Sequence, residues 1–292
     1  MNSHRFYLIV GSLLLIFVVA ACALSPASSS TGSTSVPAAA TNMPVSAATA
    51  TNLPVSASGS GNCANAYFPV STGNSWSYSS TGGALGTYTY TMTVADVSDN
   101  VFTTTEVSSL GTGTASIVKW KCKDGKLAAL DAGSNSLSMS GSKFSMTSNS
   151  ITADGYNIPG TFGSGTTWSE KVTVKGTIQA GTRTLDSQIV SKVDCSTAGT
   201  DTITGPAGTF NTVKATCNQT VAVSALVQGT PMPAGAPVPV SITNWYAKGV
   251  GLVQSVRSTA GSTENIVLTQ YGNSPLSSNS ILFPYVQPFP HV

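Results

Sequence analysis

Apolar and polar residues alternate along most of the chain between residues 62 and 271. The apolar positions of two clear examples are Tyr88, Tyr90, Met92 and Val94, then Val172, Val174 and Ile178. A period of two indicates half-buried β-strands, with one face toward a core and the other toward solvent. After residue 21, no window of ten or more residues has a clean helical period. The pattern predicts an all-β domain over residues 62–271. Its sheet is expected to be a single curved antiparallel sheet or an open half-barrel or sandwich, with little or no helix.

Two short segments have the composition of hairpin turns. Asp124-Gly125 separates two alternating segments, 117–123 and 126–131, and an Asp-Gly pair tolerates the positive φ angles of a two-residue turn. The second hairpin is predicted at residues 206–209, with Ala207 and Gly208 as its turn.

The first hairpin sorts its side chains by charge. Trp120 and Cys122 share one face of the predicted strand, and the other face carries Lys119, Lys121 and Lys123. We interpret the lysine row as a solvated face, because three like charges on one strand are a weak signal for a binding partner.

The first 22 residues have the pattern of an export signal. An apolar run from Phe6 to Ala21 follows Arg5 and ends in Val19-Ala20-Ala21-Cys22. The run has 16 residues and contains Gly11 and Ser12, so it is short for a transmembrane anchor, which needs about 20 apolar residues. The segment resembles the lipobox of bacterial lipoproteins. This resemblance implies a signal peptide over residues 1–21, fatty acylation (including palmitate) of Cys22, and a lipid anchor on the extracytoplasmic side of the cell membrane.

Two further segments lie outside the predicted domain. Residues 22–61 are rich in Ala, Ser, Thr and Pro without any charged residue, so we expect a flexible linker, with an O-glycosylated stalk as the alternative. Residues 272–292 form a Pro-rich tail. Within the domain, the uncharged segment 229–239 contains four prolines; it is expected to be an ordinary insertion or a rim for ligand or membrane contact.

The other four cysteines form an even set, which in an exported chain favours disulfides over metal ligation. If Ala207 and Gly208 form the turn, Cys217 lies opposite the neighbourhood of Ala198, within a bulge of Cys195. We therefore predict a Cys195–Cys217 disulfide and, by elimination, a Cys63–Cys122 disulfide.

Three motifs occur in order along the domain. They are Tyr67-Phe68-Pro69 with Gly73-Asn74-Ser75-Trp76-Ser77-Tyr78, then Gly205-Pro206-Ala207-Gly208-Thr209-Phe210, then Trp245-Tyr246-Ala247-Lys248-Gly249-Val250-Gly251-Leu252-Val253. Together they resemble a group of bacterial exported and lipoprotein β domains of uncharacterised function. The resemblance implies a curved antiparallel sheet similar to the half-barrels of lipoprotein carriers, and it assigns no catalytic residue.

Composition and motifs exclude several classes of function. Only 8% of the residues are charged and the formal net charge is +2, so there is no basic face for nucleic acid. After the signal the chain contains one histidine, His291, and no G-x-S-x-G motif, so no Ser-His or Cys-His catalytic pair is expected. The scattered acidic residues predict no metal site, and no cofactor is expected.

These observations lead to one main hypothesis and two alternatives. We expect a monomeric, membrane-anchored module without enzymatic activity that binds or scaffolds, with an aromatic concave face for an apolar or glycan ligand. The candidate ligand-binding residues are Trp76, Tyr78, Tyr88, Tyr90, Trp120 and Trp245. The alternatives are a structural component of the cell envelope and a hydrolase of cell-wall glycan, which would need two matched carboxyl groups.

Overall fold

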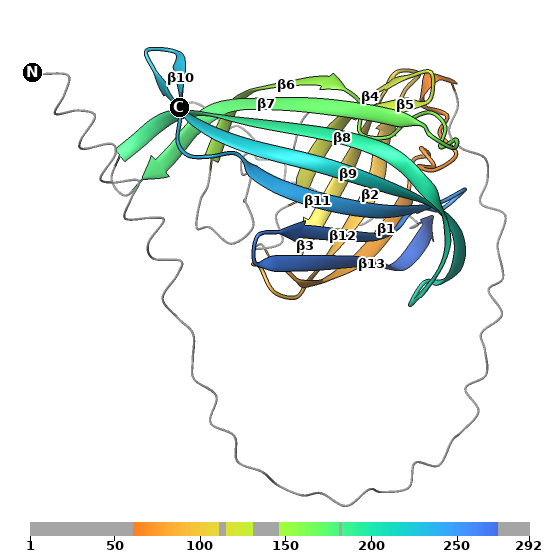
Figure 1. Cartoon of the computed structure of the whole chain (residues 1–292). Coiled ribbons are helices and arrows are strands. Elements are labelled where there is room, and N and C mark those ends of the chain that lie inside the picture. The colour runs from red at the N-terminus through yellow and green to blue at the C-terminus, as the bar shows by residue number, and fades with distance from the viewer. Residues whose placement is uncertain (1–60, 111–114, 131–145, 181–182, 274–292) are drawn as a thin grey trace, which may run out of the picture. The chain divides into compact units, whose positions relative to one another are not determined.

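The computed structural model describes residues 61–110, 115–130, 146–180 and 183–273, which belong to one compact unit, Ala50–Val292 (Figure 1). A single 3-10 turn, η1 (Gly61–Cys63), precedes the strands. The strands are β1 (Asn74–Gly82), β2 (Tyr88–Val97), β3 (Val101–Ser108), β4 (Ser116–Lys123), β5 (Lys126–Ala129), β6 (Met146–Gly155), β7 (Thr167–Ala180), β8 (Arg183–Gly205), β9 (Gly208–Val227), β10 (Thr230–Pro233), β11 (Val238–Ala247), β12 (Gly251–Thr259) and β13 (Ser262–Asn273). The all-β prediction is confirmed.

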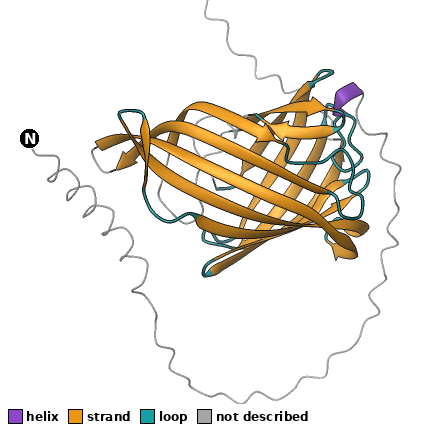
Figure 2. Cartoon of the chain, turned by 45° about the horizontal axis from the view of Figure 1, so that its top comes forward, coloured by secondary structure: helices purple, strands orange, loops and turns teal. Residues whose placement is uncertain are grey.

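All of these strands belong to one antiparallel sheet, in the order β5-β4-β3-β2-β1-β13-β12-β11-β9-β8-β7-β6, with β10 paired to β9. Of the alternatives left open by the sequence, the structure has the single curved sheet, curled until it nearly closes into a barrel (Figure 2). The two edges meet at one isolated bridge, between Leu127 of β5 and Ile158 after β6. Strands with apolar inner faces and a right-handed twist curl in this way when one sheet has to enclose its own core.

The two predicted hairpins are both present. Asp124 and Gly125 form the two-residue turn between β4 and β5, with φ of 52° and 72°. Between β8 and β9 the prediction was wrong by one residue, because Gly205 pairs with Gly208 and the turn is Pro206-Ala207. A bulge at residues 197–199 shifts the register by one more position.

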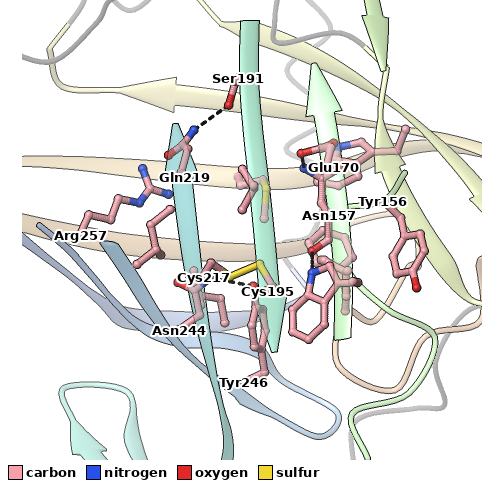
Figure 3. Close-up of a pocket in the computed structure, with 18 of the residues that line it drawn as sticks. Tyr156, Asn157, Glu170, Ser191, Cys195, Cys217, Gln219, Asn244, Tyr246 and Arg257 are labelled. Atoms are coloured by element: carbon pink, nitrogen blue, oxygen red, sulfur yellow. Dashed lines mark hydrogen bonds between the residues drawn. A yellow bond between two sulfur atoms is a disulfide. The ribbon is translucent and has the colours of Figure 1, made fainter. Parts of the chain in front are cut away.

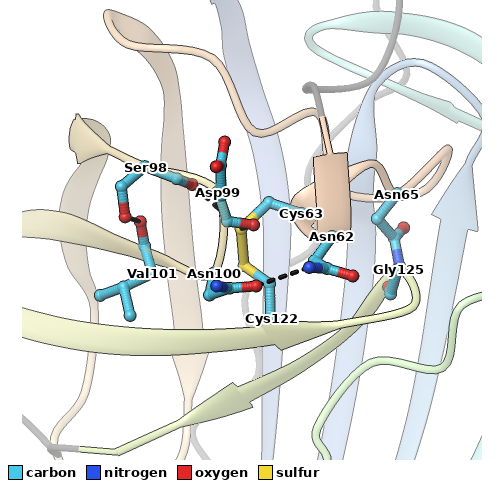
Figure 4. Close-up of a disulfide and its surroundings, with 9 residues drawn as sticks. All are labelled: Asn62, Cys63, Asn65, Ser98, Asp99, Asn100, Val101, Cys122 and Gly125. Atoms are coloured by element: carbon cyan, nitrogen blue, oxygen red, sulfur yellow. Dashed lines mark hydrogen bonds between the residues drawn. A yellow bond between two sulfur atoms is a disulfide. The ribbon is translucent and has the colours of Figure 1, made fainter.

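That shift places Cys195 directly opposite Cys217, and the structure joins them in a disulfide. The second disulfide joins Cys63 to Cys122. Both pairs are those predicted from the sequence. The first ties neighbouring strands together, whereas the second fastens the start of the domain to β4 (Figure 4).

Residues 61–73, here called the N-terminal cover, lie across one end of the barrel. Its backbone and side chains contact four different connections at that end. Gly125 N donates to Asn62 O at 2.9 Å, Asn65 Nδ2 donates to Gly125 O at 2.7 Å and to Pro159 O at 2.8 Å, and Gly249 N donates to Ala66 O at 2.7 Å. We call this end the covered end.

Because consecutive strands are antiparallel, the connections alternate between the two ends of the barrel. The connections β2–β3, β4–β5 and β11–β12 lie at the covered end. The connections β1–β2, β3–β4, β9–β10 and β12–β13 lie at the opposite end, here called the far end.

The core lies on the concave face of the sheet, where the alternation of the sequence places the apolar residues. Its fully buried side chains include Val94, Phe102, Leu127, Ile266 and Leu268. The lysines of β4 lie on the exposed outer face, as predicted. A smaller apolar cluster around Val174, Ile178 and Ile189 continues the inner face of β7 and β8 toward the far end.

Several predictions fall on residues outside the described ranges. These are the signal peptide over residues 1–21, acylation of Cys22, nearly all of the linker and nearly all of the tail. Within the described residues, none of the helical structure has the length and apolar character of a membrane span.

Candidate functional site

The inside of the barrel contains a cavity of about 390 Å³ (Figure 3). Its apolar and aromatic lining includes Phe68, Trp76, Tyr78, Tyr90, Met92, Trp120, Tyr156, Ile158, Trp168, Val193, Ile242, Tyr246 and Leu252. Its polar lining consists of Glu106, Asn157, Glu170, Ser191, Gln219, Asn244 and Arg257, and the Cys195–Cys217 disulfide also reaches it. This volume is within the range of natural small-molecule sites.

Aromatic rings build the wall next to the N-terminal cover. Phe68, from the cover, has its ring centroid 5.1 Å from that of Trp76 and 5.6 Å from that of Trp120. Trp120 stacks on Phe102 at 5.5 Å. Because the cover inserts Phe68 among these rings, the cover and the aromatic wall form one packed unit.

Two of the aromatic side chains are held by hydrogen bonds to backbone. Trp76 Nε1 donates to Val250 O, and the Tyr78 hydroxyl donates to Leu252 O at 3.1 Å. Tyr78 also stacks on Tyr90 at 4.9 Å. Burial raises the pKa of both tyrosines, so they are neutral hydroxyls at physiological pH. These rings therefore form a fixed wall with no free donor at Trp76.

Glu170 is the buried carboxyl group of the cavity. Its Oε2 accepts a hydrogen bond from Asn157 Nδ2 at 2.6 Å, whereas its Oε1 is buried without a partner. Burial raises the pKa of Glu170 to about 7. Buried polar atoms are nearly always hydrogen-bonded, so an unpartnered oxygen on a carboxyl group that lines a cavity requires an explanation.

Asn157 connects this carboxyl group to the seam of the barrel. Its Oδ1 accepts from the backbone N–H of Ala129 at 2.6 Å, and its carbonyl oxygen accepts from Trp168 Nε1 at 3.1 Å. The same residue thus fixes β5, the indole of Trp168 and the carboxyl of Glu170. The position of Glu170 is therefore set by the closure of the barrel.

A second carboxyl group, Glu106, also lines the cavity. Burial raises its pKa, and the positive charge of Arg257 offsets part of that rise. Arg257 pairs across the sheet with Glu264, whose Oε1 accepts hydrogen bonds from Tyr88 at 2.7 Å and from Ser80 at 2.8 Å.

In the same lining, Gln219 Nε2 donates to Ser191 Oγ at 2.8 Å (Figure 3). Gln219 and Ser191 come from neighbouring strands, β9 and β8, and both face the cavity. The polar groups of the lining are thus distributed around an otherwise aromatic and aliphatic wall.

The structure brings four of the six predicted ligand residues together. Trp76, Tyr78, Tyr90 and Trp120 line the cavity. Tyr88 lies on the same face and is engaged with Glu264. Trp245 lies on the other face of β11, where its Nε1 donates to Asp201 Oδ2 at 2.9 Å and Lys214 Nζ lies 5.6 Å from its ring centroid.

Sequence reasoning missed the charged residues of the cavity, although the sequence carries a signal for them. Glu170 is in phase with Val172 and Val174 on the inner face of β7, and Glu106 is in phase with Phe102 on β3. A carboxyl group on the apolar face of an alternating strand is unusual, because burying a charge is costly. Among the residues that the structure describes, no group of three or more His, Cys, Asp or Glu side chains could hold a metal ion.

The fold and the cavity define a single-sheet β-barrel domain with an internal site. The chain belongs to the DUF3108-like family, whose model matches residues 81–259, from the end of β1 to the end of β12. The match includes the second and third of the sequence motifs, at residues 205–210 and 245–253.

Two crystal structures are similar to the chain. One is of a "putative lipoprotein" from Parabacteroides distasonis ATCC 8503, at 18% identity, covering 71% of this chain and 99% of the other, with a TM-score of 0.47. The other is of a "putative exported protein with YmcC-like fold" from Bacteroides fragilis NCTC 9343, at 14% identity, with the same two coverages and a TM-score of 0.44. No curated protein matches the chain.

Proposed function

We propose that this protein is a lipid-anchored, extracytoplasmic binding module without catalytic activity, and that its cavity receives the end group of a glycan. The two disulfides support a location outside the cytoplasm, because such bonds persist in oxidising compartments. The lipobox-like segment ending at Cys22 supports the anchor.

The observation that carries the ligand proposal is the buried, unpartnered Oε1 of Glu170 in an aromatic-lined cavity. A purely apolar ligand would leave this oxygen unsatisfied, at a cost of about 1–3 kcal/mol. It would also make no use of the remaining hydrogen-bonding atoms of Gln219 and Asn244, whose amide N–H groups already bond to Ser191 and Tyr246. A sugar has hydroxyl groups for these atoms and an apolar ring face for Trp168 or Tyr246. The mixed lining therefore favours a glycan over a simple lipid.

Calorimetric titration of the full mature chain with cellobiose, chitobiose and maltose tests this proposal, and palmitate serves as the apolar alternative. We expect binding of at least one sugar, weakened roughly tenfold or more by Glu170→Gln, because a charge-assisted hydrogen bond contributes about 1.5–3 kcal/mol. Gln219→Leu is expected to weaken binding as well.

The matched control is Gln188→Leu, which makes the same change on β8 next to the inward-facing Ile189, but on the outer face of the strand. Binding should be unchanged in this variant. Binding of palmitate alone, or sugar binding that is insensitive to both cavity variants, would contradict the glycan proposal.

One observation favours a second function, the hydrolysis of a glycan. Glu106 and Glu170 line the same cavity and both have raised pKa values, as catalytic acids often do. The same sugars incubated with the protein test this function by the release of reducing ends. Hydrolysis abolished by either Glu106→Gln or Glu170→Gln would establish a hydrolase and replace the non-catalytic proposal.

A further inference from the structure

The exposed large apolar side chains of the described residues are concentrated at the far end of the barrel. They are Leu85, Val107, Leu110, Ile117, Leu185, Val227, Met232 and Val238, each between 37% and 53% exposed. Leu85 and Leu110 lie in the β1–β2 and β3–β4 connections, and the other six lie on strands near the same end. We call these eight residues the apolar rim.

The two ends of the barrel differ in charge as well. At the far end, the connections 83–87, 109–115, 181–182, 228–229, 234–237 and 260–261 contain no charged residue, and Arg183 flanks one of them. The long connection 130–145, which lies largely outside the described residues, contains Asp131 and Lys143. At the covered end, by contrast, Asp99, Asp124 and Lys248 lie in the connections, and Lys123 and Lys126 flank them.

The loop that contains β10, which carries Met232, stands out from the rest of the sheet (Figure 1). Met232 pairs with Ala225 and Val238 pairs with Val221, so both lie on the inner face of the sheet beyond the cavity. Prolines 231 and 233 in β10 remove backbone donors, which limits the pairing of further strands at this edge.

The rim residues come from β1–β2, β3–β4, β8 and β9–β11, which lie around the circumference of the barrel. Leu85, Leu110 and Met232 lie at the end itself, in two connections and in β10, and a broad surface can contact all three, whereas a small globular partner would contact only a part of them. The rim is apolar and its described connections are uncharged, so its partner surface should be one that buries apolar side chains and does not depend on charge pairs for binding.

We propose that the far end of the barrel docks on the surface of a lipid bilayer through the apolar rim. The length of the preceding chain permits this orientation. Gly61 lies at the covered end and is 39 positions from Cys22, and a chain of this length reaches about 130 Å when extended. The longest strand, β8, has 23 residues and spans about 76 Å, so a chain anchored at Cys22 can pass along the barrel with its far end on the membrane.

Flotation with vesicles tests the proposal on the mature chain, residues 22–292, carrying Cys22→Ser so that no acyl group contributes. The vesicles are of phosphatidylcholine, without and with phosphatidylglycerol. We expect the chain to float with both, and the triple variant Leu85→Gln, Leu110→Gln and Met232→Gln to lower partitioning on the order of a hundredfold, for three partly inserted apolar side chains. The matched control, Lys123→Gln, Lys126→Gln and Lys248→Gln at the covered end, should bind like the parent.

A direct readout covers the case in which the triple variant folds poorly. A tryptophan introduced by Leu110→Trp should be quenched by brominated phosphatidylcholine, while the same change at exposed Thr202 of the covered end should not be quenched. The proposal is overturned if the parent chain binds neither vesicle, or if the rim variant binds as well as the parent. Binding only to phosphatidylglycerol vesicles that the lysine control abolishes would also overturn it, because binding would then be electrostatic.

Discussion

Leu127 and Ile158 join the two edges of the sheet. The backbone N–H of Leu127 donates to Ile158 O at 3.0 Å, and that of Ile158 donates to Leu127 O at 3.2 Å. Both side chains are buried. The bridge brings β5 next to the segment after β6, so that Asn157 can reach both Ala129 and Glu170. The seam of the barrel and the carboxyl of the cavity are therefore parts of one hydrogen-bonded arrangement.

The seam predicts an unequal response to two apolar truncations in the same hairpin. Leu127→Ala should lower the free energy of unfolding by about 2–5 kcal/mol, because it removes fully buried methyl groups and leaves a cavity. Ile117→Ala, at a side chain 53% exposed on neighbouring β4, should change it by about 0.5 kcal/mol or less. Urea unfolding of both variants measures the difference. Equal effects would show that the seam does not contribute to stability.

Glu170 predicts a dependence of stability on pH. Its pKa is about 7 in the folded state against 4.5 for the unperturbed group, so the folded protein binds the proton more tightly than the unfolded chain. The stabilisation that comes from this tighter proton binding is fully present below about pH 4.5 and is lost as the pH rises to about 7. Above that pH, Glu170 causes no further change in the free energy of unfolding. Each pKa unit corresponds to about 1.4 kcal/mol.

Glu170→Gln should therefore make the free energy of unfolding depend less on pH between about 4.5 and 7, and this variant should be more stable than the parent at pH 8. Glu106→Gln is the comparison, and it should act in the same direction, because burial raises the pKa of Glu106 as well. Chemical unfolding of the parent and of each variant at pH 5 and pH 8 gives the change in the free energy of unfolding with pH. A Glu170→Gln variant that keeps the slope of the parent would contradict the assignment.

The close approach of Gly125 to the N-terminal cover predicts a large loss of stability when this glycine is replaced. Its φ is 72°, and an added Cβ would lie 2.7 Å from the carbonyl oxygen of Ala64 in the cover. Gly165 has a similar φ of 73°, but an added Cβ there would have no atom within 4 Å. Gly165→Ala thus measures the backbone strain alone, about 1 kcal/mol.

Gly125→Ala adds a clash with the backbone of the cover, so we expect a clearly larger loss of stability and faster proteolysis near residue 64. Thermal unfolding and limited proteolysis of the two variants provide the measurements. If both variants lose the same stability, the cover yields to the added methyl group at no cost.

The lipobox-like segment predicts where the protein is found after export. Replacement of Cys22 by serine removes the thiol that would be acylated, and two acyl chains hold a protein on a membrane where one is marginal. Without detergent, we expect the parent in the membrane fraction, while Cys22→Ser accumulates as an unprocessed precursor. Metabolic labelling with palmitate should mark only the parent. A processed, membrane-held Cys22→Ser protein at normal abundance would contradict lipid anchoring.

Much of the cavity wall could be predicted from the alternation of residues, because side-chain direction along a strand is a local property. Trp76, Tyr78, Tyr90 and Trp120 were identified in this way, and four of the six candidates reach the cavity. Trp245 was assigned to the same face, but it lies on the opposite side of β11. β11 itself alternates regularly, with Ile242, Asn244 and Tyr246 facing the cavity, so the prediction chose the wrong one of two neighbouring aromatic residues.

The sequence alone predicted the alternating strands, the Asp124-Gly125 turn and the Cys195–Cys217 pair, because periodicity, turn chemistry and loop length act over short distances along the chain. The Cys63–Cys122 pair, separated by 59 residues, was predicted only by elimination. Only the tertiary structure decided that the sheet closes at Leu127 and Ile158, and that closure brings Glu106, Glu170 and Arg257 to one cavity. These three residues lie on β3, β7 and β12, and their meeting depends on the curvature of the whole sheet. Curvature is the sum of twist, bulges and packing over all strands, so no single segment of sequence specifies it.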